Sequence, residues 1–171
     1  MRGSVNIILP DTYPIRTSKF ANRRINRRSP YAMQGELIVA PSTSGKSFDP
    51  SMFLNNQEFP FEVLTMVPRV VCLDTNGIPI ADPTGIPSVY SYVSMTMKLL
   101  GVAREMTKSN SRLLGLLPLD AMEMDFASPL YIERSEGFDV TMSNALPSSA
   151  AAGGVRISIS FLGSLIELSE R

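Results

Sequence analysis

Three stretches of the chain alternate strictly between apolar and polar residues, and this period of two constrains the fold more than any other feature. They are residues 93–99, 138–142 and 155–161. Such alternation is typical of a β-strand with one face in the core and the other toward solvent. We expect 138–142 and 155–161 to pair as a long antiparallel hairpin. Gly163 should break or bulge the last strand before a final run at 165–168.

Further strand candidates are separated by turn and loop signals. They are the short apolar runs 36–40, 61–67, 69–74 and 130–133, with Pro68 dividing the second from the third. Asn76-Gly77 is a strong turn signal. Residues 42–60 and 78–87 are rich in loop-forming residues, with a helical turn expected near 52–54, and a short helix is expected to open at Pro118.

Long connections between about eight strands favour a Greek-key sandwich or a jelly roll over a simple meander. Thirteen prolines and eleven glycines in 171 residues fit such a chain better than a helical one. The sequence therefore predicts an all-β fold, an antiparallel β-sandwich of jelly-roll or Greek-key type with an extended N-terminal arm.

The net charge of zero conceals a strong asymmetry. Residues 1–34 carry seven basic side chains and one acid, Asp11, a net of +6, whereas the rest carries nine basic and fifteen acidic side chains, a net of −6. Pro10, Pro14 and Pro30 interrupt this first segment, which has little apolar surface to bury. We therefore expect two regions, a basic extended arm at 1–34 and a β-sandwich domain at 35–171.

The arm carries the candidate partner-binding residues. Arginine binds carboxylates and phosphates through paired hydrogen bonds, and flanking apolar side chains would add contact area. Three roles remain open: docking against a neighbouring subunit, contact with nucleic acid, and simple solvation of the arm. The candidate residues are Phe20, Arg23, Arg24, Ile25, Arg27 and Arg28.

Ordinary catalytic constellations are missing from the composition. Histidine is absent and cysteine occurs once, at Cys72, so there is no Ser–His or Cys–His pair, no intrachain disulfide and no Cys/His zinc set. Asp120, Glu123 and Asp125 lie in one short stretch and are better explained as a solvated face than as a metal site. We expect no enzyme activity, no catalytic residue, no cofactor and no metal. We also expect Cys72 and the alternating methionines, Met95, Met97 and Met142, to be core residues.

One segment resembles a phosphate-binding loop. Residues 40–47, Ala-Pro-Ser-Thr-Ser-Gly-Lys-Ser, follow an expected strand and approach the pattern G-x-x-x-x-G-K-[ST]. Ala40 replaces the first glycine, and Pro50 falls where the helix of such a loop should run. The segment is better explained as a polar surface loop, with nucleotide binding as the alternative.

The basic, proline-broken arm followed by a compact sandwich resembles small virion proteins. The stretches 129–141 and 155–162 are similar to bacteriophage capsid-associated structural proteins in their strand pattern. The resemblance implies a minor capsid, cement or vertex-type protein that forms homo-oligomers, contacts other virion proteins and needs no cofactor. A nucleic-acid-binding β module using the arginine cluster is the main alternative.

The expected location is the virion, after synthesis in the host cytoplasm. The first residues lack the apolar core of a signal peptide, and no run approaches the roughly 18 apolar residues of a membrane helix.

Overall fold

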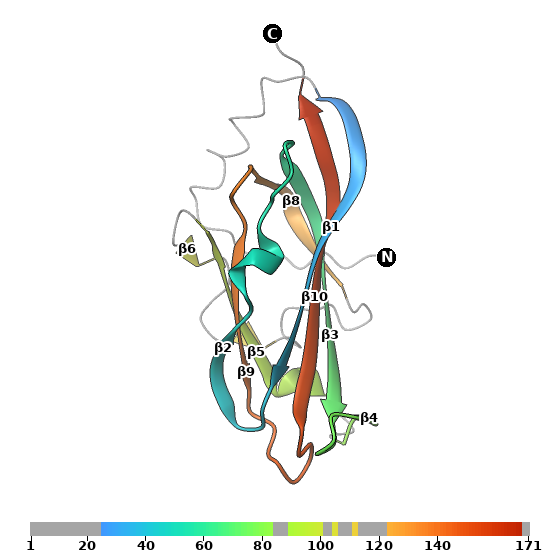
Figure 1. Cartoon of the computed structure of the whole chain (residues 1–171), viewed down its shortest axis with the longest axis vertical. Helices are drawn as coiled ribbons and strands as arrows, with labels where there is room; N and C mark the ends of the chain where they lie inside the picture. The colour runs from blue at the N-terminus through green and yellow to red at the C-terminus, as the bar shows by residue number, and fades with distance from the viewer. Residues whose placement is uncertain (1–24, 84–88, 101–103, 106–110, 113–122, 169–171) are drawn as a thin grey trace.

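The computed structural model describes residues 25–83, 89–100, 104–105, 111–112 and 123–168. These residues form ten β-strands and two short 3₁₀ helices, and none of their helices is long and apolar enough to cross a membrane. The strands build two antiparallel sheets that pack face to face (Figure 1). The expected all-β antiparallel sandwich is confirmed.

Sheet A is built around β10 (Gly154–Leu168), the long strand that Figure 1 shows in red. β10 pairs with β1 (Ile25–Val39) on one side and with β3 (Phe61–Leu73) on the other. The far edge of β3 pairs at two separate places, with β8 (Met124–Ile132) and with β4 (Pro79–Ile80).

Sheet B is built around β9 (Phe138–Asn144). This strand lies between β2 (Thr43–Ser47) and β5 (Val93–Leu99). β5 also pairs with the two-residue strands β6 (Arg104–Glu105) and β7 (Ser111–Arg112). The side chains of β5 and β9 alternate between buried and half-buried, as their sequence period predicts.

The strand pairing is that of a jelly roll. β1 pairs with β10, β2 with β9 and β3 with β8, while β5 pairs with β6 and β7, so the first strands pair with the last in a nested order. The chain crosses from one sheet to the other at each step between these nested pairs. This double wrapping distinguishes a jelly roll from a meander.

The expected hairpin between 138–142 and 155–161 is wrong. β9 belongs to sheet B and β10 to sheet A, so the connection over 145–153 passes between the sheets. The two strands instead face each other through the core, where the rings of Phe138 and Phe161 stack with centroids 4.3 Å apart. Alternation defines which face of a strand is buried but not which strand it pairs with.

Aromatic side chains fill the space between the sheets. The short helix η1 (Pro50–Phe53) places Phe53 against Phe161 and Phe48, at ring-centroid distances of 5.2 and 5.1 Å. The alternating methionines, Met95, Met97 and Met142, are fully buried in the same core, as expected. The helical turn expected near 52–54 is thus confirmed as a 3₁₀ turn, whereas β2 forms where only a loop was expected.

Pro68 does not divide β3 into two strands. Alternate residues of a strand direct their backbone N–H and C=O groups to the same side, and the N–H of Val70 donates to the Tyr90 hydroxyl of η2 (Val89–Ser91), away from β10. The backbone nitrogen of Pro68 therefore also points away from β10. Pro68 lies between the segments of β3 that pair with β8 and β4. No ladder hydrogen bond is lost there, which is where a strand tolerates proline.

The boundary expected at residue 34 is also corrected. Residues 25–34 lie in β1 and pair with β10, so they belong to the sandwich, while residues 1–24 lie outside the described residues. Pro30 fits this strand because β1 is an edge of sheet A among the described strands. The turn at Asn76-Gly77 is confirmed, with Gly77 at a φ of +76°, whereas the helix expected at Pro118 lies outside the described residues.

Candidate functional site

The described part of the predicted partner-binding cluster lies at the start of β1. Ile25 and Arg27 pair across the ladder with Leu168 and Glu167 of β10, and Arg27 is exposed. Arg28 is the next residue along the strand. Phe20, Arg23 and Arg24 lie outside the described residues. We call residues 25–28 the basic end of β1.

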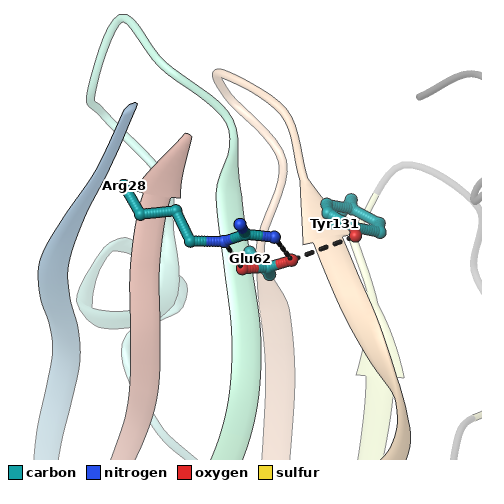
Figure 2. A network of polar contacts seen from close by, with 3 residues as sticks. All are labelled: Arg28, Glu62 and Tyr131. Atoms are coloured by element: carbon teal, nitrogen blue, oxygen red, sulfur yellow. Dashed lines mark hydrogen bonds and ion pairs between the residues drawn. The ribbon is translucent and has the colours of Figure 1, made fainter. Parts of the chain in front are cut away.

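Arg28 is held by a carboxylate of its own chain (Figure 2). Its Nε and Nη2 atoms donate to the two carboxylate oxygens of Glu62, at 2.9 and 3.2 Å. The Tyr131 hydroxyl donates to Glu62 Oε1 at 3.0 Å. Since Arg28, Glu62 and Tyr131 belong to β1, β3 and β8, the network ties three strands together across β10.

The carboxylate of this network is buried although it lies on the outer face of sheet A. Phe61 and Val63 point into the core, so Glu62, between them, points the other way. Its side chain is only 5% exposed, whereas that of Arg28 is 54% exposed. Buried charges occur in proteins mainly when they are paired and hydrogen-bonded, as Glu62 is.

The geometry of this network keeps Arg28 cationic and Tyr131 neutral. The hydrogen bonds and the charge of Glu62 raise the pKa of Arg28, which therefore stays cationic. Burial, followed by the hydrogen bond to Glu62, raises the pKa of Tyr131, which therefore stays neutral. A permanent cation and a neutral hydroxyl donor around one carboxylate form a clamp between strands.

The loop-like segment 40–47 does not form a phosphate cradle. It contains the turn after β1 and then β2, and the residues that follow lead into a 3₁₀ turn rather than the long helix of a phosphate-binding loop. The Lys46 ammonium donates to the backbone carbonyl of Ile38 at 2.7 Å. The Gly45 N–H donates to Ser143 Oγ at 2.9 Å, so this donor is not free to bind phosphate.

Cys72 and the acidic stretch that contains Asp125 have the surroundings of residues that stabilise the fold. Cys72 is 2% exposed, in line with its expected core position, and burial raises the pKa of its thiol. Asp125 accepts a hydrogen bond from Thr65 at 2.7 Å, and Asp120 lies outside the described residues. Within the ranges that the structure describes, no three acidic, cysteine or histidine side chains are grouped for a metal ion.

Sequence reasoning identified Arg28 but missed Glu62 and Tyr131. Glu62 is 34 residues from Arg28 and Tyr131 is 69 residues from Glu62, so no local spacing relates them. The one available signal was the position of Glu62, an acid inside the apolar run Phe61–Val67. If such a side chain is buried on the strand face that points away from the core, it needs a hydrogen-bonding partner.

The chain was compared with protein-family models, with curated proteins and with solved structures, and nothing matches it significantly.

Proposed function

We propose that this chain is a virion structural protein, a minor capsid, cement or vertex component that assembles through the surfaces of its sandwich and its basic N-terminal segment. The observation that carries the proposal is the nested strand pairing of a jelly roll, an architecture used in viral capsid domains. Proteins of many functions share one fold, so the proposal also needs support from the chemistry of the protein surface.

The outer face of sheet A offers a surface for subunit contact. Ile38, Arg156 and Val71 form one row across β1, β10 and β3. Ile38 and Val71 are 44% and 37% exposed. Arg156 Nε lies 3.5 Å from Glu36 Oε1, so aliphatic and paired charged side chains alternate on this face. Aliphatic contacts with a charged rim are typical of protein–protein interfaces.

The basic end of β1 lies on the same sheet. The bidentate pair with Glu62 fixes the Arg28 guanidinium, yet about half of the side chain remains exposed. A guanidinium has five N–H donors, and Glu62 engages two of its nitrogen atoms, so donors remain for an acidic partner. Such a contact would use an arginine that is already ordered, which lowers the entropic cost of binding.

The mechanism of such a protein is geometric. The sandwich supplies a rigid block whose outer faces meet neighbouring subunits. Residues 1–24 carry five basic side chains and one acid, a net of +4, and would contact an acidic neighbour. Ordering a segment costs about 1–2 kcal/mol per residue in backbone entropy, so the partner surface must be large.

A nucleic-acid-binding module is the second candidate, favoured by the exposure of Arg27 and Arg28. Size-exclusion chromatography with light scattering, with and without a DNA oligonucleotide and at two salt concentrations, separates the candidates. Oligomers without DNA support the assembly role. Monomers that bind DNA in a salt-dependent manner support the second candidate. Monomers that do not bind DNA contradict both.

A further inference from the structure

A cleft of about 410 Å³ lies where the turn between β1 and β2 meets β5 and β9 of sheet B. Its volume falls within the range of small-molecule sites, roughly 300–1,000 Å³. Nothing in the proposed assembly role uses this cleft. The lining residues that matter for its chemistry are Ser42, Ser44, Tyr92, Ser94, Ser143 and Asn144.

One buried lining residue of the cleft, Asn144, is held by three hydrogen bonds. Asn144 is 1% exposed, and its amide nitrogen donates to the carbonyls of Val39 and Ala40, both at 3.2 Å. Its Oδ1 accepts the N–H of Leu146 at 2.9 Å. The Asn144 amide therefore ties the end of β9 to the end of β1 and holds the two sides of the cleft together.

The walls carry hydroxyl groups with unused hydrogen-bonding capacity. Ser143 Oγ accepts the N–H of Gly45, so its own O–H is left to donate. Within the part of the chain that the structure describes, the hydroxyls of Ser42, Ser44 and Ser94 have no protein partner. The cleft thus presents several donors and acceptors from three different strands or turns.

The character of these groups restricts the ligand. All the described side chains that line the cleft are uncharged, and Lys46 donates to Ile38 instead. A charged ligand would lose water without gaining a counter-charge from the described lining residues, and an apolar ligand would leave the hydroxyls unpaired. A neutral ligand with many hydroxyl groups satisfies both conditions.

We propose that this cleft binds a neutral saccharide of one or two sugar residues. The serine hydroxyls bind its hydroxyl groups. Tyr92 lines the cleft and is partly packed against the core, so it is the aromatic side chain available to the C–H face of the sugar. The inference is independent of the assembly role, since it rests on sheet B rather than on sheet A.

The test is saturation-transfer NMR and calorimetry on the full chain with a panel of neutral mono- and disaccharides, including glucose, galactose, N-acetylglucosamine, maltose and lactose. We expect at least one to bind and Ser94→Val to weaken it about fivefold or more, the effect of losing one neutral hydrogen bond. Ser160→Val is the matched control, because Ser160 is a half-buried serine in the middle of β10 on the other sheet.

A second variant guards against an indirect effect of Ser94→Val on folding. Ser44 is exposed on β2, so Ser44→Tyr should fill the cleft without disturbing the core, and saccharide binding should be lost at an unchanged melting temperature. The proposal is overturned if no saccharide of the panel binds, if the Ser94 and Ser44 variants bind as well as the wild type, or if inorganic phosphate displaces the bound saccharide.

Discussion

Arg28 and Glu62 form a bidentate ion pair that passes over β10 and joins the edge strand β1 to β3. The carboxylate is buried and the guanidinium is half exposed, so the two partners contribute unequally to stability. Removing the exposed partner leaves a buried charge without its cation, which is the costly way to break such a pair.

Arg28→Ala should therefore destabilise the protein by about 1–3 kcal/mol, measured by urea unfolding. The neighbouring residue supplies the control. Arg27 is also exposed, and Arg27→Ala removes the same charge from the same strand at a cost of less than about 0.5 kcal/mol. Equal effects of the two substitutions would show that the ion pair contributes nothing beyond net charge.

The tyrosine of the network predicts a dependence of stability on alkaline pH. The pKa of Tyr131 is raised in the folded state, so the folded protein retains this proton when the unfolded chain has begun to lose it. The stabilisation is complete below the ordinary tyrosine pKa of about 10 and is lost as the pH rises through the folded pKa. Unfolding free energies measured across this range should fall less steeply for Tyr131→Phe than for the wild type. Parallel curves would refute the assignment.

Gly163 lies at the register shift of β10, where a side chain has no room. A Cβ atom there would overlap the backbone oxygen of Glu62, so Gly163→Ala should cost about 2–3 kcal/mol. At Gly77 the φ is +76°, and an added Cβ atom would have no heavy atom of a described residue within 4 Å apart from its chain neighbours. Gly77→Ala should therefore cost only backbone strain, about 1 kcal/mol. Thermal melting of the two variants should preserve this order.

The position of β1 determines how much of the N-terminal segment can be deleted without loss of the fold. Deleting residues 1–24 leaves every described strand intact, so we expect a folded sandwich that has lost assembly. Deleting residues 1–34 also removes the part of β1 that pairs with residues 160–168 of β10, and should unfold or strongly destabilise the domain. Circular dichroism and light scattering on both truncations provide the test. A shorter truncation that still assembles would remove residues 1–24 from the mechanism.

A single substitution on the outer face of sheet A tests subunit contact there. Val71→Asp places a charge among Ile38 and Arg156, and should dissociate the oligomer or weaken it at least tenfold, equivalent to about 1.4 kcal/mol. Ile78 is 57% exposed in the turn after β3, so Ile78→Asp introduces the same charge away from this face and should leave the oligomer mass unchanged. Sedimentation velocity measures both, and an unchanged mass for Val71→Asp would contradict contact through this face.

The local pattern of the sequence was sufficient for β5 and β9, the two central strands of sheet B. Residues 93–99 form β5 as expected, and 138–142 lie within β9, because alternation of apolar side chains encodes which face of a strand is buried. The same pattern placed Met95, Met97 and Met142 in the core. The turn at Asn76-Gly77 could be predicted for a similar reason, because the positive φ of Gly77 is a local requirement of the turn.

The tertiary structure alone decided which strands are partners. β9 and β10 follow each other in the chain and both alternate, yet they lie in different sheets, because the nested wrapping of the jelly roll pairs β10 with β1 and β3. The same long-range pairing makes a strand of the arginine-rich residues 25–34, whose composition predicted an arm. It also brings Glu62 and Tyr131 to Arg28. Pairing between strands depends on backbone hydrogen bonds that every residue except proline offers alike, so side-chain pattern specifies the face of a strand and leaves its neighbour to the packing of the whole domain.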